Sequence, residues 1–145
     1  QVGSSAASDV YKRQPGGNVN IIDFVEFSTT GNAVDFGDLT EARRYPCGTS
    51  SNTRGLMAAG YTNQIKDDID SIQIASKGNG TDYGDLSQTR FGCGSLSNNI
   101  RGIFAAGVTP SRVTTMDFGS FSNAGTLADF GDLVEVHGQL LAPHL

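Results

Sequence analysis

Apolar residues along this chain gather in short runs, and polar or glycine-rich stretches separate one run from the next. RGLMAAGY at residues 54–61 and RGIFAAGV at residues 101–108 are compact apolar runs with glycine near their ends. KGNG at residues 77–80 has turn chemistry, because glycine and asparagine tolerate positive φ. TDYGDLSQTR at residues 81–90 then supplies a further short strand with an aromatic residue and a leucine. This pattern predicts short strands joined by tight turns.

One run shows the alternation of a half-buried strand. In DDIDSIQIAS, residues 67–76, the side chains of Ile72 and Ile74 fall on the same face of an extended chain. Ile69 is out of phase with these two residues. We therefore predict a β-bulge or a local twist in the backbone near Asp70.

The whole pattern repeats along the chain. Gly37, Gly84 and Gly131 follow one another at a constant step of 47 residues, and no insertion or deletion interrupts the repeat between Ile21 and Leu133. Four short strands in about 47 residues is the size of one blade of a β-propeller. The sequence therefore predicts a tandem array of β-sheets.

The order of residues in each period resembles the kelch repeat. An apolar strand, RGLMAAGY, is followed by a loop, the acidic strand DDIDSIQIAS, the turn and aromatic step KGNGTDYGDL, and SQTR ending in arginine. The kelch glycine pair is reduced to Ala59-Gly60 and Ala106-Gly107, and Phe or Tyr stands where kelch repeats usually have Trp. The chain is also similar to uncharacterised arrays with FGDL…SSxTRG spacing from marine phage and bacterial metagenomes.

This resemblance implies an all-β fold, a fragment of a kelch-like β-propeller with about two and a half four-stranded blades. We expect residues 15–43 to form the outer half of a blade, and residues 44–90 and 91–137 to form two complete blades. SSAASDVYKRQ near the N-terminus resembles a translated sequencing adapter, so we interpret residues 1–14 as a disordered artefact. Residues 138–145 are a divergent tail.

DFGDL, DYGDL and DFGDL again occur once in each period. Asp-Phe-Gly also holds magnesium in protein kinases, but the other kinase motifs are missing and one active site needs no three copies. We expect the aromatic ring to fill the wedge between sheets, the glycine to permit a bend, and the carboxylates to accept backbone N–H groups. The residues assigned to the structural repeat are Asp35, Phe36, Gly37, Asp38, Asp82, Tyr83, Gly84, Asp85, Asp129, Phe130, Gly131, Asp132, Arg54 and Arg101.

The main alternative for the acidic motif is calcium, because paired carboxylates beside a glycine turn suit a hard cation. A dedicated calcium loop brings three or more oxygen-bearing side chains, whereas each copy here brings two aspartates, three residues apart. We therefore predict no metal and no other cofactor, with calcium as the alternative to the structural role.

Arginine recurs at two places in the period. Arg43 and Arg90 are one step apart, and so are Arg54 and Arg101. We expect these side chains to pair with a carboxylate or carbonyl of a neighbouring blade, with Asp70 and its counterparts as natural partners. A ring of arginines that binds an anion is the alternative.

Composition excludes several functions. The chain has 145 residues and a net charge of −5, from 10 basic and 15 acidic side chains, and no basic block that would bind nucleic acid or an anionic membrane. Its longest apolar runs are too short to span a bilayer. His137 and His144 are the only histidines, so the repeat itself has no histidine for metal or nucleophile chemistry. Cys47 and Cys93 form neither a disulfide framework nor a zinc pattern, and we expect both to be small, semi-buried residues.

Binding residues are expected where the copies differ, because ligands break the symmetry that a scaffold keeps. Residues 61–67 and 108–113, in the loop before the acidic strand, differ most. We predict Tyr61, Gln64, Lys66 and Arg112 as binding residues and no catalytic residue.

We therefore predict a non-enzymatic scaffold or binding module for a protein or glycan partner, in a virion or extracellular setting. One alternative is a structural repeat that self-associates through its open sheet edges. Another is a non-catalytic fragment of a larger propeller enzyme.

Overall fold

The computed structural model describes residues 5–8 and 17–135, and these residues contain strands and loops but no helix. The all-β prediction is therefore confirmed. We name residues 17–43 the first unit, residues 44–90 the second unit and residues 91–135 the third unit. The strands are β1 (Ser5–Ser8), β2 (Val19–Glu26), β3 (Val34–Arg43), β4 (Cys47–Ser50), β5 (Arg54–Tyr61), β6 (Ile65–Gln73), β7 (Thr81–Asp85), β8 (Gly94–Ser97), β9 (Arg101–Ala105), β10 (Val108–Thr109), β11 (Ser111–Arg112), β12 (Thr115–Ser120) and β13 (Ala128–Asp132).

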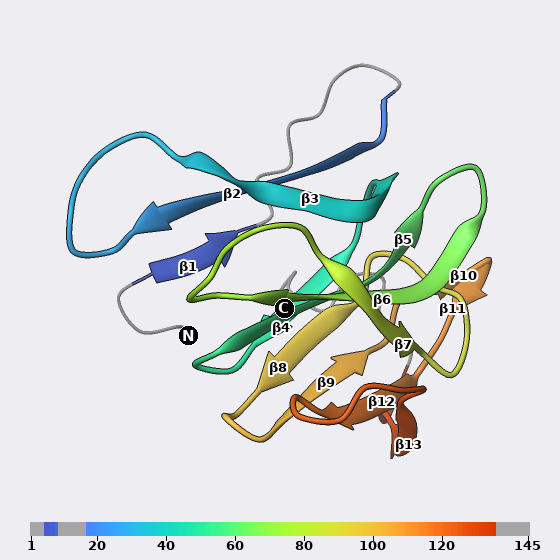
Figure 1. The fold of residues 1–145 in the computed structure, drawn as a ribbon. Helices are drawn as coiled ribbons and strands as arrows, with labels where there is room; N and C mark the ends of the chain where they lie inside the picture. Colours follow the sequence, from blue (N-terminus) through green and yellow to red (C-terminus); the bar gives the residue numbers. More distant parts are fainter. Residues whose placement is uncertain (1–4, 9–16, 136–145) are drawn as a thin grey trace.

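The strands form three main antiparallel sheets that follow the order of the chain (Figure 1). The first sheet has the order β1-β2-β3, the second β4-β5-β6-β7, and the third β13-β12-β9-β8, while β10 and β11 form a separate two-stranded ribbon. The predicted propeller is not seen as a closed ring in the part of the chain that the structure describes. Across the same residues, no helix has the length and apolar character needed to cross a membrane.

The predicted bulge near Asp70 is confirmed, and it recurs in every unit. The register of β6 against β7 shifts between Ile69 and Asp70, and that of β12 against β13 shifts between Met116 and Asp117. The pairing of β2 with β3 shifts at the counterpart of this step as well. The three sheets therefore share the same local irregularity, although the first has three strands and the other two have four.

The expectation of disorder in residues 1–14 needs correction at Ser5–Ser8. These residues form β1, which pairs antiparallel with β2 from Ser5 opposite Glu26 to Ser8 opposite Asp23. An exposed edge of β2 offers unpaired N–H and C=O groups, which any extended segment can satisfy. The rest of residues 1–14 and the tail at residues 138–145 lie outside the described residues, so their assignments stay predictions.

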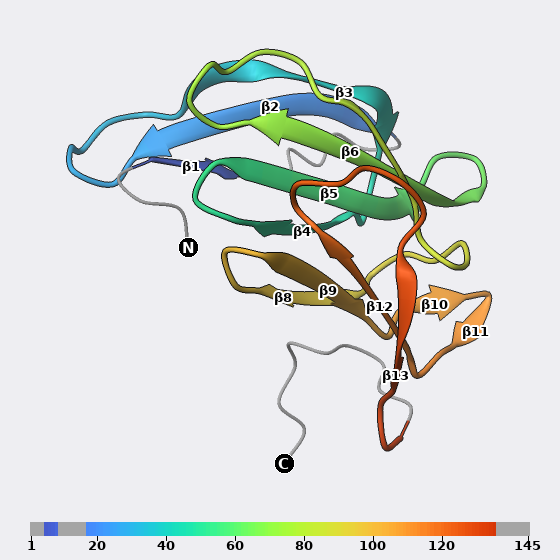
Figure 2. The same ribbon diagram turned by 60° about the horizontal axis from the view of Figure 1, so that its bottom comes forward.

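The hydrophobic core lies between consecutive sheets, and Figure 2 shows the sheets stacked one after another. Phe24, Phe36 and Leu39 of the first unit form one cluster with Ile72 of the second. A second cluster joins the second and third units, and its members are Cys47, Leu56, Ala58, Ala59, Ile69, Tyr83, Leu86, Phe104, Phe121 and Leu127. Each unit therefore depends on its neighbour for burial, as expected for a repeat architecture.

The prediction that the two cysteines are merely small, semi-buried residues was wrong. Cys47 and Cys93 form a disulfide, with their Cα atoms 5.8 Å apart. Cys47 begins β4 and Cys93 precedes β8, and these two strands of neighbouring units lie side by side, with Ser97 Oγ 2.8 Å from the Ser50 carbonyl oxygen. The covalent bond therefore joins the second unit to the third.

Candidate functional site

The repeated glycine of the DFGDL motif is where one unit receives the next. Gly37 and Gly84 have φ values of +152° and +149°. A Cβ atom on Gly37 would overlap the backbone of Gly78, and one on Gly84 would overlap the backbone of Gly125. Only glycine allows so close an approach at that conformation.

Backbone hydrogen bonds fix this approach. At the first junction, the N–H of Gly78 donates to the Phe36 carbonyl at 2.9 Å and the N–H of Gly80 donates to the Asp38 carbonyl at 2.7 Å. The same pair of bonds recurs one period later at the second junction, at 2.7 and 2.8 Å. The motif therefore presents carbonyl groups to the glycine-rich turn of the following unit.

A buried ion pair accompanies each junction. Arg43 lies 3.6 Å from the carboxylate of Asp70, and Arg90 pairs with Asp117, so each arginine reaches the carboxylate of the next unit. All four side chains are almost fully buried. The backbone N–H and hydroxyl of Thr40 also donate to Asp70, at 2.9 and 2.7 Å.

This arrangement confirms the prediction for Arg43 and Arg90, whose partners are Asp70 and its counterpart Asp117. Burial lowers the pKa of Arg90, and the charge and hydrogen bond of Asp117 oppose that shift. A buried arginine that loses its carboxylate would be an uncompensated charge, which is strongly destabilising. The function of the motif and its arginine is therefore to dock one unit onto the next.

The third copy of the motif has no following unit among the described residues. Phe36 and Tyr83 are 5% and 3% exposed, whereas Phe130 is 48% exposed. The Tyr83 hydroxyl donates to the carbonyls of Ser120 and Asn123 in the third unit. The predicted wedge is therefore present at two of the three positions.

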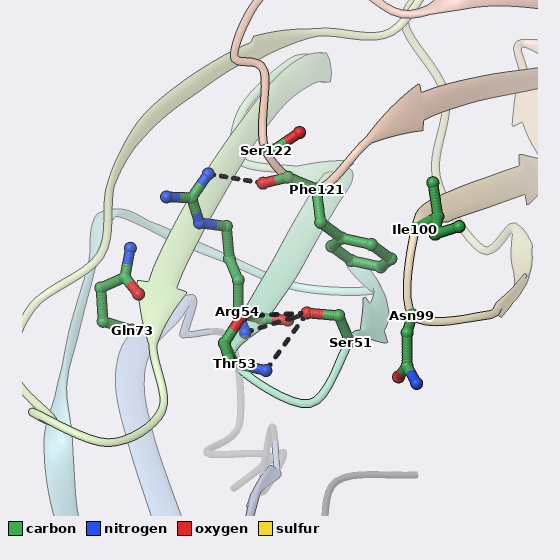
Figure 3. A pocket seen from close by; sticks show the side chains of 8 residues that line it. All are labelled: Ser51, Thr53, Arg54, Gln73, Asn99, Ile100, Phe121 and Ser122. Carbon is green, nitrogen blue, oxygen red and sulfur yellow. Dashed lines mark hydrogen bonds between the residues drawn. The ribbon is translucent and has the colours of Figure 1, made fainter.

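A pocket of about 390 Å³ opens at the junction of the second and third units (Figure 3). It is built by the β4–β5 loop, the start of β5 and the end of β6, which face the β8–β9 loop and the segment after β12. The lining residues are Ser51, Thr53, Arg54, Gln73, Asn99, Ile100, Phe121 and Ser122.

Arg54 is the one charged residue of this lining, and it is held in place by the neighbouring unit. Its Nη1 donates to the Phe121 carbonyl at 2.6 Å, as Figure 3 shows. This agrees with the expectation that Arg54 pairs with a group of the next unit, while its counterpart Arg101 lies over the ring of Phe118, 5.0 Å from the centroid.

Hydrogen bonds also fix the β4–β5 loop. Ser51 Oγ accepts the N–H groups of Thr53 and Arg54, at 3.2 and 3.1 Å. In Figure 3, Gln73 lies on the same side of the pocket as the Arg54 side chain, and Asn99 lies across the pocket beyond Ser51 and Phe121. Their side-chain amides can donate and accept hydrogen bonds, so the pocket offers a fixed cation and two adaptable polar groups.

The residues predicted for binding lie at the opposite end of the strands. Tyr61 ends β5, whereas Arg54 of the pocket begins it. Its ring lies 4.9 Å from the Arg44 guanidinium and 6.0 Å from the centroid of Phe91. Gln64 and Arg112 are exposed there. The structure thus places these side chains at one end of the molecule, and their role in binding stays a prediction.

Lys66 is already committed to ion pairs. Its Nζ lies 3.2 Å from Glu41 and 3.1 Å from Asp68, and hydrogen bonds to Asp68 and Glu41 raise the pKa of Lys66 above its usual value. This bonding leaves the ammonium group less available to a ligand.

Three carboxylates meet beside Lys66. Oxygens of Asp67, Asp68 and Asp85 lie within 4.8 Å of one another. The pKa of Asp85 is raised, first by desolvation and then by the charges of Asp67, Asp68 and Asp82. Only Asp85 of this group comes from a DFGDL-type motif, so the group differs from the pair on which the calcium alternative rested, and that alternative stays a prediction.

No family model matches this chain, and no curated protein sequence matches it.

The pocket was missed by the sequence-based prediction because its lining comes from three loops in two units. The sequence held one indication of this pocket: the residue that corresponds to Gln73 is Glu26 in the first unit and Ser120 in the third. That position also differs between copies, as a ligand-binding position should.

Proposed function

We propose that this chain is part of a kelch-like β-propeller and acts as a non-enzymatic module that binds an acidic glycan. The binding site is the pocket between the second and third units. The observation that carries this proposal is the fixed guanidinium of Arg54 in a pocket that the amides of Gln73 and Asn99 also line.

Two features support the propeller part of the proposal. Consecutive sheets stack through the same contacts at both junctions, as blades do. Ala59 and Ala106 have φ values of +65° and +62°, at the positions where kelch repeats carry the first glycine of their pair. A non-glycine residue is strained in this conformation, so the backbone at both positions is one that glycine adopts most readily, as in the kelch pair.

The chemistry of the pocket supports a glycan with a carboxylate. Arginine binds carboxylates through paired N–H donors, and glutamine and asparagine can bond sugar hydroxyls. Ile100, which is 69% exposed, adds apolar surface against which a sugar ring can rest. A volume of about 390 Å³ suits one or two sugar residues.

The same lining supports binding without catalysis. The described lining residues include no carboxylate, imidazole or thiol that could serve as a general base or nucleophile. The Cys47–Cys93 disulfide supports an oxidising environment, which agrees with a virion or cell-surface setting.

Glucuronate and glucose serve as the charged and neutral probes, and a panel of acidic glycans extends the test. We expect glucuronate to shift NMR signals of the pocket and to bind more tightly than glucose. Gln73→Ala and Asn99→Ala should each weaken binding about threefold to tenfold, the value of one hydrogen bond. Gln64→Ala is the matched control, since it removes an exposed glutamine at the opposite end of the strands.

Two results would contradict this assignment. One is equal weakening by Gln64→Ala, which would move the site to the predicted loops. The other is no binding of any acidic glycan by a folded chain.

A further inference from the structure

The first and third units each leave one apolar face uncovered by the described residues. The C-terminal face belongs to the third unit, where Phe130 is 48% exposed although its counterparts Phe36 and Tyr83 are 5% and 3% exposed. The N-terminal face belongs to the first unit, where Phe27 is 52% exposed although its counterpart Phe121 is 5% exposed. Both faces therefore have the apolar composition of an internal junction without its burial.

The two faces also match in hydrogen-bonding groups. At the second junction, the N–H of Gly125 donates to the Tyr83 carbonyl at 2.7 Å. The sequence step of 47 residues makes Phe130 the counterpart of Tyr83, and Gly31 the counterpart of Gly125. The C-terminal face thus presents the acceptor strand of a junction. The N-terminal face carries the sequence counterpart of the donor turn, although Gly31 lacks the positive φ of Gly78 and Gly125.

Gly131 has the backbone conformation of the two glycines that receive a turn of the following unit. Its φ is +138°, close to the values of Gly37 and Gly84. The nearest atom to a Cβ built on Gly131 is Cε of Met116, at 3.9 Å. The space that a neighbouring turn fills at Gly37 and Gly84 is therefore open at Gly131 among the described residues.

We propose that the C-terminal face of one copy of this chain docks on the N-terminal face of a second copy. The contact reproduces the internal junction between units, with Phe130 as the wedge and the turn at Gly31 as the incoming element. Because the two faces differ, this association is heterologous and runs head to tail. It goes beyond the proposed glycan binding, and it uses no residue of the pocket.

One part of the internal junction is missing from this contact. Asp23 is the counterpart of Asp70 and Asp117, but the residues at the positions of Ser87 and Arg90 are Val134 and His137. Val134 is fully exposed, and His137 lies outside the described residues. The contact between copies therefore rests on apolar packing and backbone bonds, and it should be weaker than the junctions inside the chain.

The test uses three variants of the full chain that each place an arginine at a half-exposed apolar position. Phe130→Arg blocks the C-terminal face and Phe27→Arg blocks the N-terminal face. Val34→Arg is the matched control, since Val34 is 53% exposed and its counterpart Thr81 also stays exposed in a unit that is docked on the next one. Circular dichroism verifies that each variant is folded.

Analytical ultracentrifugation over a concentration series measures the mass of each species. We expect the original chain and Val34→Arg to associate, and Phe130→Arg and Phe27→Arg to remain monomers. A mixture of the two blocked variants should give a one-to-one dimer, because the first retains an N-terminal face and the second a C-terminal face. Association of either blocked variant alone, or a monomeric original chain, would overturn the proposal.

A gain-of-function variant keeps the test decisive if a blocked variant fails to fold. Val134→Ser combined with His137→Arg restores the two donors that face Asp70 and Asp117 at the internal junctions. We expect the dissociation constant between copies to fall at least tenfold. No change in a folded double variant would argue against docking on the face that carries Asp23.

Discussion

Replacing the central glycine of the repeated motif by alanine should destabilise the chain only where a neighbouring unit is docked on it. Gly84 and Gly131 stand in the same motif, with φ values of +149° and +138°. A Cβ on Gly84 would overlap the backbone of Gly125, whereas one on Gly131 has its nearest neighbour at 3.9 Å. Gly84→Ala and Gly131→Ala therefore form a matched pair that differs in docking and shares the backbone strain.

The expected difference follows from three contributions. Positive φ costs a non-glycine residue about 1–3 kcal/mol, and this cost falls on both variants. The overlap at Gly84 adds about 1–3 kcal/mol, as overpacking does in a well-packed core. Displacing the turn weakens the hydrogen bonds from Gly125 and Leu127, each worth about 1 kcal/mol. Gly84→Ala should thus cost about 3–5 kcal/mol more than Gly131→Ala, a large share of the stability of a small domain.

Urea denaturation measures this difference from the midpoint and slope of the transition. The protein is diluted until it is monomeric, so that no turn of a second copy lies against Gly131 and adds to the cost of Gly131→Ala. Gly37→Ala should behave like Gly84→Ala, because a Cβ there would overlap Gly78. Equal losses for Gly84→Ala and Gly131→Ala would refute the docking role, since strain alone would then explain both.

Three further predictions concern single side chains and the disulfide. Tyr83→Phe should cost about 1–2 kcal/mol in urea, because it removes the hydroxyl that donates to two carbonyls of the third unit; an unchanged midpoint would contradict this. The pKa of Asp85 is raised, so the folded chain loses stability as this carboxyl group ionises. Asp85→Asn should therefore stabilise the chain above roughly pH 5, by less than about 1 kcal/mol because the group is exposed, and should have no effect near pH 3. Thermal unfolding at both pH values verifies the sign, and a loss of stability at neutral pH would show that Asp85 makes a favourable contact. Cys47→Ala with Cys93→Ala should cost about 4 kcal/mol, the loop-closure value for a separation of 46 residues, and reducing agent should have no further effect on that variant.

The repeat made much of the fold predictable from the sequence. A constant step of 47 residues requires every unit to have the same strands, and an out-of-phase isoleucine predicted the bulge at Asp70. The pairing of the repeated arginines with Asp70 and its counterparts also followed, because a buried cation needs a carboxylate. These features depend on contacts that repeat, so the spacing carries the information.

Features that break the repeat could not be predicted in the same way. Cys93 is the counterpart of Pro46, so the two cysteines occupy different positions of the period. Cys47 is the first residue of β4, whereas Cys93 is the residue before β8, the strand of the third unit that corresponds to β4. Only the stacking of the two units brings the two sulfur atoms together. The strand β1 was also missed, since it depends on an open edge and not on its own composition.

The candidate site is specific to one junction, because the lining changes between junctions while the docking contacts do not. At the first junction, Glu26 stands in the place of Gln73, and Ile74 in the place of Phe121. A carboxylate at the position of Gln73 would repel an acidic ligand. The two junctions therefore have the same architecture but different side chains in the pocket region. Ligand specificity can change only through side chains that do not dock one unit onto the next, because the docking side chains are needed at both junctions.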